Sequence, residues 1–407
     1  MQQQELLNAD CVIDRLYVKY RNSYEPFELL QVIADHLNTL FTNYNYNREF
    51  VKERLFKILG YQEKLQKLKE MPVVEQRSPE WYAMRQTRIT ASDFAQALGE
   101  GKFASQKDFL KKKCGYEPDN FNSDSPPLKW GIKYEPVAID AYANKNKMKL
   151  IDFGLLPHPN ISWFGASPDS ITELGVMVEI KCPYKRKITG EVPMQYYYQM
   201  QGQLDVCELD ECDFLECEFL EYYDENEFAT HYRDNTNDKG VMIEYLDNGA
   251  TKYAYNPFEF HANLEATLRW KHETLEAFFA DADKKVVRFY HWQLNTFSVV
   301  RVYRDPNFLK EKLSLLEQVW NKIVLYKQNR ALYDAEIGGV TGGPTGGLAG
   351  GASGLAKRQF DEIDLNAYDS LVPPTGMFPP KPAEKIKEVR GTIKMSGYAF
   401  VSDDESD

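Results

Sequence analysis

Nowhere in the sequence is there an apolar run near the ~18 residues that a membrane-spanning helix needs. The first residues, MQQQELLNADCVIDR, also lack a charged segment followed by an apolar stretch, so no secretory signal is expected. The cysteines form no CxxC pair: Cys11, Cys114, Cys182, Cys207, Cys212 and Cys217. Disulfide staples are therefore not predicted. We expect an intracellular protein in a reducing compartment, with no membrane partner.

Positive charge is also scarce, since the formal net charge is −12. This argues against a protein that coats nucleic acid through bulk electrostatics, but it leaves room for a local basic groove. Three runs are candidates: Lys107 with Lys111, Lys112 and Lys113; Lys129 with Lys133; and Lys181 with Lys185, Arg186 and Lys187. Any one run alone is typical of a solvated face. Their closeness to the carboxylates described below favours a functional role.

The 407 residues exceed what one core usually organises. Apolar spacing predicts an N-terminal helical accessory region over 1–75. Residues 76–336 are expected to form the main domain, and its pattern predicts an α/β fold with a central mixed sheet flanked by helices. Nine glycines between Gly338 and Gly354 predict a linker over 337–357. A disordered, acidic-ended tail is expected over 358–407.

Within the main domain, helices are predicted over parts of 78–99, over 105–115, 131–146 and 192–206, and from 307 onward. The second helix of 78–99 is expected to be capped by Thr90 or Ser92, and residues 123–130 are expected to be a loop. Short apolar runs at 150–156, 162–171, 175–183 and 212–223 predict strands. Residues 286–305 resemble a hairpin.

A group of charged residues stands out among these strands: Asp169 in GASPDSI, and Glu179 with Lys181 in MVEIKCP. Residues two apart in a strand share a face, so Glu179 and Lys181 point together. Ile180 then points into the core and leaves its carbonyl near the acids. A tight hairpin between Asp169 and Glu179 would bring the two carboxylates together.

Two buried acids repel each other, and a divalent cation relieves that repulsion. Ligands that are all oxygen favour Mg²⁺, with Mn²⁺ as the alternative. A neighbouring lysine can hold the attacking water or offset charge in the transition state of phosphodiester hydrolysis. The spacing alone is common. Here it lies between apolar strands, after a helix that carries Glu135 and before a glutamine-rich helix.

Several segments, in order, resemble the lambda-exonuclease-type (viral recombinase) branch of the PD-(D/E)xK nucleases. They are WYAMRQTRITAS, WGIKYEPVAIDAY, GASPDS, VEIKCP and YYYQMQGQL, and they span roughly residues 78–220. Residues 286–305 and the helix after them resemble members from large double-stranded DNA viruses. The resemblance implies a restriction-endonuclease-like core. It also implies a Mg²⁺-dependent deoxyribonuclease that acts 5′ to 3′ on double-stranded DNA, in viral recombination, replication or repair.

The resemblance also implies roles for individual residues. The metal ligands would be Asp169, Glu179, the backbone carbonyl of Ile180, and Glu135 near a second ion. Lys181 would orient or activate water. Gln199 would position that water or the lysine, and Gln203, one turn later, is the alternative. Arg85 and Ser92 match the family's pocket for a 5′-phosphate, where a guanidinium fork and a hydroxyl at a helix start suit phosphate oxygens.

The implied partners are double-stranded DNA with 5′-phosphorylated ends, a single-strand annealing protein and two further copies in a homotrimer. The implied location is the host cytoplasm, the viral factory or the nucleus. One position departs from the family pattern, because Ser170 follows Asp169 where SPDG is usual. Serine commonly tolerates such a site.

Other features are better explained by packing. Cys207, Cys212 and Cys217 are expected to be buried thiols, with the last two on opposite faces of a strand, rather than ligands of an iron–sulfur cluster. The run Tyr196–Tyr198 is expected to cover the sheet rather than to stack on bases. His158 and His291 lack a partner histidine at zinc-ligand spacing.

Three hypotheses remain. The first is the exonuclease, and the second is a structure-directed endonuclease or nickase that uses the same metal site. The third is a non-catalytic scaffold that binds DNA or a partner. The complete set of Asp169, Glu179 and Lys181 argues against the scaffold, because burying such charges without chemical use is costly.

Overall fold

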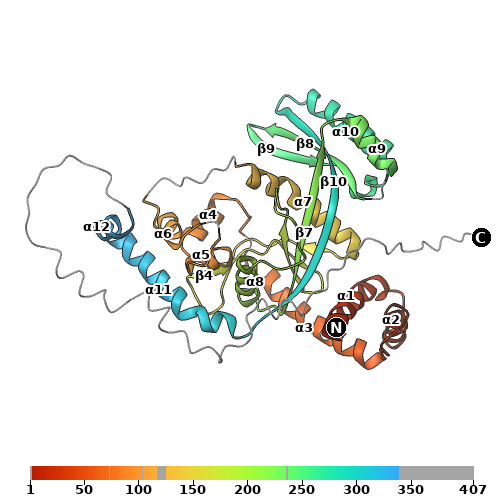
Figure 1. Cartoon of the computed structure of the whole chain (residues 1–407), viewed down its shortest axis with the longest axis horizontal. Coiled ribbons are helices and arrows are strands. Elements are labelled where there is room, and N and C mark those ends of the chain that lie inside the picture. Colours follow the sequence, from red (N-terminus) through yellow and green to blue (C-terminus); the bar gives the residue numbers. More distant parts are fainter. Residues whose placement is uncertain (1, 73, 103, 117–124, 235–236, 339–407) are drawn as a thin grey trace, which may run out of the picture.

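The computed structural model describes residues 2–72, 74–102, 104–116, 125–234 and 237–338. Figure 1 shows N-terminal helices at one side, a central sheet, and a group of strands and helices that extends from one end of the sheet. The predicted linker from residue 339 onward and the predicted tail lie outside the described residues. In the described part, no helix is both long and apolar enough to cross a membrane.

The N-terminal region is helical, as predicted, with α1 (Gln2–Tyr20), α2 (Pro26–Leu40) and α3 (Arg48–Lys69). Asn47 caps α3 by accepting a hydrogen bond from the backbone N–H of Phe50, 3.0 Å away. Apolar side chains that include Ile13, Ile33 and Val51 form a core shared by these helices.

Buried charges tie the N-terminal helices to the sheet. Arg54 of α3 donates to Asp14 of α1 and, at 2.6 Å, to Glu211. Glu211 also accepts from Arg301, and Arg301 bonds Asp213 at 2.5 Å. These pairs lie where the start of one strand, at Glu211, pairs with the end of another, near Arg301. Helix α3 is therefore fixed to the sheet by hydrogen-bonded charges as well as by apolar packing.

The main sheet is mixed and has seven strands in the order β2-β5-β6-β7-β10-β8-β9. Their bounds are β2 (Leu150–Ile151), β5 (Ser170–Thr172), β6 (Met177–Lys181), β7 (Glu211–Tyr222), β8 (Lys239–Asp247), β9 (Ala250–Tyr255) and β10 (Lys284–Tyr303). Strands β6 and β7 are parallel, and the other neighbours are antiparallel. A smaller sheet has the order β1-β4-β3, from β1 (Ile89–Thr90), β3 (Leu156–Pro157) and β4 (Phe164–Ala166). The predicted α/β class is confirmed.

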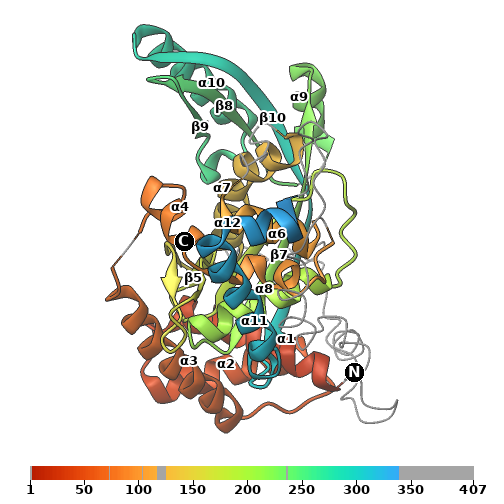
Figure 2. The ribbon, with the colours of Figure 1, turned by 90° about the vertical axis from the view of Figure 1, so that its left-hand side faces the viewer.

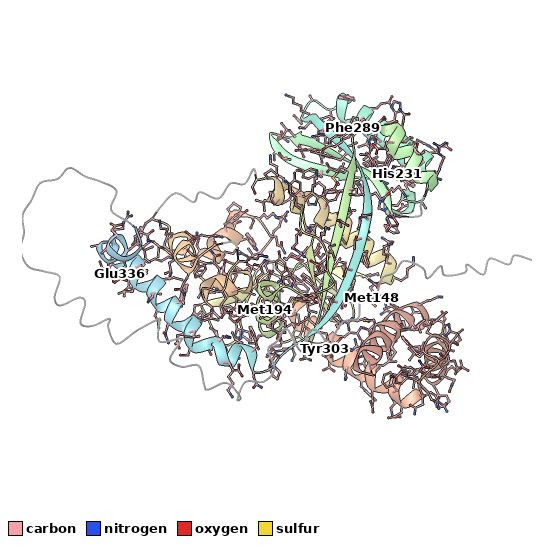
Figure 3. The ribbon with its side chains drawn as sticks, viewed as in Figure 1. Met148, Met194, His231, Phe289, Tyr303 and Glu336 are labelled. Atoms are coloured by element: carbon pink, nitrogen blue, oxygen red, sulfur yellow. The ribbon has the colours of Figure 1, made fainter. Side chains whose placement is uncertain are left out.

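The hairpin predicted over 286–305 is wrong, because these residues form the single strand β10. Strand β10 pairs with β7, and the register of this pairing shifts at Asn295, between Leu294 and Thr296 of β10. The extra residue bulges out and the strand continues, since β7 pairs with β10 on both sides of Asn295, from His291 to Tyr303. In Figure 3, Phe289 marks the upper part of β10 and Tyr303 its lower end.

Helices flank both sheets. They are α4 (Pro79–Gln86), η1 (Ala91–Asp93), α5 (Phe94–Ala97), α6 (Gln106–Cys114), α7 (Pro126–Asn146), α8 (Met194–Val206), α11 (Phe308–Gln328), α12 (Arg330–Tyr333) and the π-helix Asp334–Gly338. Helix α6 begins after Ser105 and ends before Gly115, as predicted. Helix α7 begins earlier than predicted. Pro126 and Pro127 occupy its first turn, where the missing N–H groups cost nothing.

We call one further unit of the structure the arm. It consists of α9 (Glu225–Asp234), β8, β9, the 3₁₀ turn η2 (Phe258–Phe260), α10 (Leu264–Ala280) and the upper part of β10. Figure 2 shows the arm above α7, with β9 on the side facing that helix.

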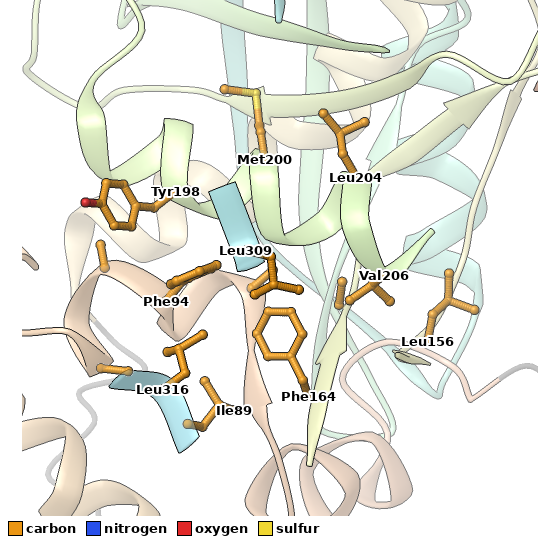
Figure 4. Packing of buried hydrophobic residues seen from close by; sticks show 14 of the residues in the cluster. Ile89, Phe94, Leu156, Phe164, Tyr198, Met200, Leu204, Val206, Leu309 and Leu316 are labelled. Carbon is orange, nitrogen blue, oxygen red and sulfur yellow. The ribbon is translucent and has the colours of Figure 1, made fainter. Parts of the chain in front are cut away.

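The largest core lies between α5, α8, α11 and the small sheet. Phe94, Phe164, Leu204 and Leu316 meet there without solvent exposure (Figure 4). Gly202 of α8 allows the close contact with η1, because a Cβ there would lie 3.0 Å from the Cβ of Ala91 and would force one of the two to shift. This close packing sets the position of α8 relative to the turn at 91–93.

Candidate functional site

The β5–β6 hairpin brings the predicted acids together. Asp169 immediately precedes β5, and Ser170 pairs with Val178 across the hairpin. One carboxylate oxygen of Asp169, Oδ2, accepts a hydrogen bond of 2.7 Å from the backbone N–H of Ile180. Asp169 is thereby held beside Glu179. Ile180 packs in the core on the α7 side of the sheet, as its place in the strand predicts.

Glu179 is fully buried and has a partner on each oxygen. Lys181 donates to Oε1, so the two side chains do share a face of β6. Gln203 of α8 donates to Oε2 at 2.8 Å. The residue that contacts the acid is therefore Gln203, which the sequence offers as the alternative to Gln199. Gln203 Oε1 is buried and has no hydrogen-bond partner among the described residues.

The side chain of Glu135, on α7, lies in the same cluster as Asp169 and Glu179. It accepts a hydrogen bond of 3.1 Å from Arg77, in the loop before α4. Arg77 has a left-handed backbone, with φ of 67°. This conformation is costly for a residue with a side chain and often marks a functional site. The loop is fixed by Gln76, which donates to the carbonyl oxygens of Phe153 and Pro168.

Electrostatics confirm that the four charged groups act on one another. Burial raises the pKa of Asp169 well above its usual value; Glu179 adds to the increase, and Lys181 opposes it. Burial likewise raises the pKa of Glu135, against the charges of Arg77 and Lys181. Burial disfavours the charged form of Lys181, yet Glu179 and Asp169 raise its pKa. The Lys181 ammonium group therefore opposes, but does not cancel, the effect of burial on the pKa values of Asp169 and Glu135.

A pocket of about 270 Å³ opens onto this cluster. Its lining includes Glu135, Asp169, Ile180 and Lys181, together with Arg186 from the basic run and three residues not predicted to be in the site: Arg77, Cys182 and Tyr196. The ring of Tyr196 lies 5.1 Å from the Lys181 nitrogen. Tyr196 therefore lines the site instead of only covering the sheet. Its neighbour Tyr198 is buried in the core, as predicted.

Arg186 is anchored by a buried acid. Its guanidinium bonds Glu216 of β7, and Glu216 is paired in register with Lys181. Because Glu216 is only 1% exposed, it fixes the arginine at the edge of the pocket. Of the basic run at 181–187, Lys181 and Arg186 line the pocket, whereas Lys185 and Lys187 are exposed. A pattern of charge alone does not show which members face a pocket.

The donor set fits a hard divalent cation. As the side chains lie here, no group of three or more His, Cys, Asp and Glu residues in the described part is arranged to hold an ion. The Lys181 ammonium group is paired with Glu179 at this position. The groups around it are nevertheless carboxylate and carbonyl oxygens, with the unpaired Gln203 oxygen next to them. Such oxygens are the ligands that Mg²⁺ and Mn²⁺ prefer.

The predicted phosphate-binding pair also comes together. Arg85, near the end of α4, donates a hydrogen bond of 2.9 Å to the hydroxyl of Ser92, an exposed residue in η1. Thr90 precedes this turn, and both its N–H and its hydroxyl donate to Asp93, so Thr90 is the cap. Ser92 follows the cap directly.

A buried ion pair stabilises the backbone around the Arg85–Ser92 pair, which we call the second position. Lys113 of α6 contacts Asp93 at 2.8 Å and donates to the carbonyl oxygens of Arg85 and Arg88. Although burial opposes it, Lys113 holds the pKa of Asp93 well below its usual range. In the basic run from Lys107 to Lys113, Lys113 therefore has a structural role, because its side chain is buried with 3% exposure. It fixes the backbone that carries Arg85.

Trp81 connects the Arg85–Ser92 pair to the acidic cluster. Its indole N–H donates to the hydroxyl of Ser167, 3.1 Å away, and Ser167 lies two residues before Asp169. The Arg85 guanidinium lies over the indole ring, 4.5 Å from its centroid. One aromatic side chain therefore sets the arginine relative to the acids.

The remaining predictions concern packing. The cysteines are free, and Cys207, Cys212 and Cys217 are buried. Cys212 and Cys217 belong to different cores on opposite faces of β7, as predicted. Ser170 is fully buried and donates to Asp152 at 3.0 Å, so the serine that replaces glycine after Asp169 is accommodated by its own hydrogen bond.

Comparisons with known proteins agree with this geometry. Residues 80–210 match the model of the YqaJ-like viral recombinase domain. An uncharacterized protein of Acanthamoeba polyphaga mimivirus is 26% identical over 73% of this chain, and the alignment spans 61% of that protein's length. A protein of African swine fever virus, from a tick isolate from Malawi, is 23% identical over 60% of this chain and 84% of its own length.

Among solved structures, an alkaline exonuclease from Laribacter hongkongensis shows 18% identity, covers 64% of this chain and 99% of its own, and has a TM-score of 0.39. A phage-related exonuclease from Haemophilus somnus shows 12% identity, covers 60% of this chain and 96% of its own, and has a TM-score of 0.33. Scores this low do not establish a shared fold by themselves. The match at residues 80–210 contains α4, Ser92, Glu135, the β5–β6 hairpin and Gln203. This chain therefore carries a YqaJ-like viral recombinase domain and has relatives in large double-stranded DNA viruses.

Proposed function

We propose that the protein is a Mg²⁺-dependent deoxyribonuclease that degrades double-stranded DNA from 5′-phosphorylated ends, 5′ to 3′. The observation that carries the proposal is that Asp169 and Glu135 line one pocket together with Lys181, whose ammonium group bonds the buried Glu179 behind it. The proposed ligands are these carboxylates and the carbonyl of Ile180. When bound, Mg²⁺ supplies Lewis-acid chemistry: it polarises the phosphodiester and makes water a better nucleophile.

The chain's own residues account for the rest of the reaction. Lys181 is held cationic by its acidic neighbours, and it would place positive charge where negative charge develops on the phosphoryl oxygens. Gln203 fixes one oxygen of Glu179, and its own free oxygen would accept a hydrogen bond from the attacking water. Arg186, anchored by Glu216, would hold a non-reacting phosphate at the pocket edge.

Recognition of the DNA end follows from the second position. Arg85 and Ser92 offer donors to a terminal phosphate, and Trp81 fixes their separation from Asp169. A 5′-phosphate held by this pair would present a neighbouring phosphodiester to the acids. The reaction would proceed from the 5′ end and leave 3′ single-stranded tails suited to annealing. The homotrimer, the single-strand annealing partner and an intracellular site of action remain parts of this proposal.

We also propose that residues 76–336 form the nuclease domain, with residues 1–75 bracing it. The contacts of Arg54 with Glu211 support this, because they connect α3 to the sheet that carries Lys181.

Linear and closed circular duplexes test the proposal directly. Each strand end of the linear DNA is labelled in turn, and the protein is incubated with Mg²⁺, Ca²⁺ or EDTA. We expect label to be released from 5′ ends in Mg²⁺ only, with circles left intact. Cleavage of circles would favour a structure-directed endonuclease. Unchanged degradation by an Asp169→Ala, Glu179→Ala double variant would rule out the proposed site.

A further inference from the structure

The inner face of the arm, opposite α10, adjoins α7, the helix that lines one side of the candidate pocket. The hydroxyl of Tyr255 in β9 donates to the backbone carbonyl of Lys133 in α7 at 3.0 Å, and Lys133 lies two residues before Glu135. Burial raises the pKa of Tyr255, and the charges of Tyr253, Glu135 and Arg77 also act on it. The end of β9 therefore packs against α7, the helix that carries Glu135 into the pocket.

Strand register places a set of aromatic and basic side chains on this face. Tyr253 pairs with Glu244, which pairs with Arg288; Tyr255 pairs with Met242, which pairs with Tyr290. Directly paired residues share a face of an antiparallel sheet. The opposite face is covered by α10, where Tyr245 packs on Phe278 with ring centroids 4.4 Å apart.

Two of the tyrosine rings are neighbours, and basic groups lie over the third. The centroids of Tyr253 and Tyr255 are 6.4 Å apart, and Arg288 lies 5.1 Å from the Tyr290 ring. Lys133 lies over the same Tyr290 ring at 3.8 Å. The tyrosines are half-buried and Arg288 is exposed, so this face is open to solvent beyond the pocket.

Charge on this face is balanced. Lys133 pairs with Glu221, and Tyr290 donates to Glu244 at 2.5 Å. A groove that follows a duplex backbone requires an excess of positive charge. Half-exposed tyrosines with an arginine beside them instead suit base stacking, which tolerates any sequence.

We propose that the inner face of the arm, formed by Tyr253, Tyr255, Tyr290 and Arg288, is a stacking platform for unpaired DNA nucleotides at the edge of the pocket. The proposal rests on the proposed function, since it takes the pocket to hold DNA. The occupant follows from the position of this face next to the pocket. A DNA strand that is separated from its complement at the cleavage site would contact this face next. The face lies outside the matched residues 80–210.

Binding and crosslinking in EDTA test the platform without hydrolysis. Affinity for a fluorescently labelled single-stranded oligonucleotide and for a blunt duplex is measured by anisotropy with the full chain, Tyr253→Leu and Phe279→Leu. Phe279 is the matched control because it is an aromatic residue of the arm, 75% exposed, in the helix on the other face. We expect Tyr253→Leu to weaken single-strand binding about tenfold, with duplex binding and Phe279→Leu within about twofold of wild type.

Oligonucleotides with 5-iododeoxyuridine give a second readout on the unmodified protein, which decides the matter if Tyr253→Leu does not fold. Photocrosslinks at Tyr253, Tyr255 or Tyr290, mapped by mass spectrometry, would support the platform. Crosslinks confined to other peptides, or equal losses for Tyr253→Leu and Phe279→Leu, would overturn it. Hydrolysis of linear duplex in Mg²⁺ is measured on the same preparations. Wild-type protein that binds single strands through the arm but cuts nothing would refute the proposed function and not the platform.

Discussion

Gln203 donates a hydrogen bond of 2.8 Å to Oε2 of Glu179, an acid whose other oxygen is held by Lys181. Groups that orient a metal ligand commonly contribute about 10–100-fold to activity. We therefore expect Gln203→Ala to lower the rate of duplex hydrolysis by a factor in that range. Gln199→Ala, on the same helix, should stay within about threefold. Initial rates in Mg²⁺ measure both, and a larger loss for the Gln199 variant would contradict the assignment.

The Arg85–Ser92 pair predicts a preference for phosphorylated ends. Arg85→Ala should lower the rate on 5′-phosphorylated duplex more than on 5′-hydroxyl duplex, because it removes the fork that holds phosphate oxygens. We expect the ratio of the two rates to fall about tenfold or more, the effect of losing one charge-assisted hydrogen bond. The matched control is Arg88→Ala, whose guanidinium contacts Met84 and Thr87. An unchanged ratio for Arg85→Ala would remove this residue from the end-binding position.

Much of the site is predictable because it depends on short-range geometry. Residues two apart in β6 must share a face, and a short hairpin must bring Asp169 back to Glu179. The cap at Thr90 likewise follows from local sequence. Arg77, Arg186 and Tyr196 are not predictable in this way. Their roles depend on which elements pack together, such as β7 supplying Glu216 to Arg186.

The error at β10 has a related cause. Asn295 and Thr296 interrupt the apolar alternation and resemble a turn, but β7 pairs with β10 on both sides of them, so the interruption becomes a bulge. Single-sequence patterns do not show the length of a neighbouring strand. The same limit applies to Gln199 and Gln203, since both lie on α8 and only packing against β6 decides which one reaches the acid.

Cation binding should be measurable without DNA. Mg²⁺ that binds the folded chain raises its unfolding free energy by about 2.7 kcal/mol at a concentration 100 times the Kd. We expect Mg²⁺ to raise the Tm of the wild type, and to have little effect on Asp169→Asn, which keeps the shape of the side chain but loses its charge. Differential scanning fluorimetry with Mg²⁺, and with matched NaCl as the ionic-strength control, measures the shifts. Equal shifts in both proteins would place the cation elsewhere.

The buried charges between α3 and the sheet predict a specific acid sensitivity. Burial opposes ionisation of Glu211, but Arg301 and Arg54 lower its pKa from 4.5 to about 2. A carboxyl whose pKa is depressed on folding stabilises the protein fully above its unfolded value, and that contribution is lost as pH falls from about 4.5 through about 2. A shift of this size corresponds to about 3 kcal/mol. Denaturant unfolding from pH 7 to 2.5 should show wild-type stability falling in that window.

Glu211→Gln isolates this contribution. The variant keeps the side-chain volume but leaves Arg54 and Arg301 with less negative charge nearby, so it should be less stable than wild type at pH 7 by a few kcal/mol. The difference should shrink as pH falls below 4.5, because the carboxyl of Glu211 in the unfolded wild-type chain then becomes protonated, whereas the folded chain takes up this proton only near pH 2. Glu173→Gln is the control: this partly exposed acid pairs with Arg21, so its effect should be smaller. A wild-type-minus-Glu211→Gln difference that stays constant from pH 7 to 2.5 would show that the acid does not titrate in this window. The coupling between the N-terminal helices and the sheet would then not depend on its charge.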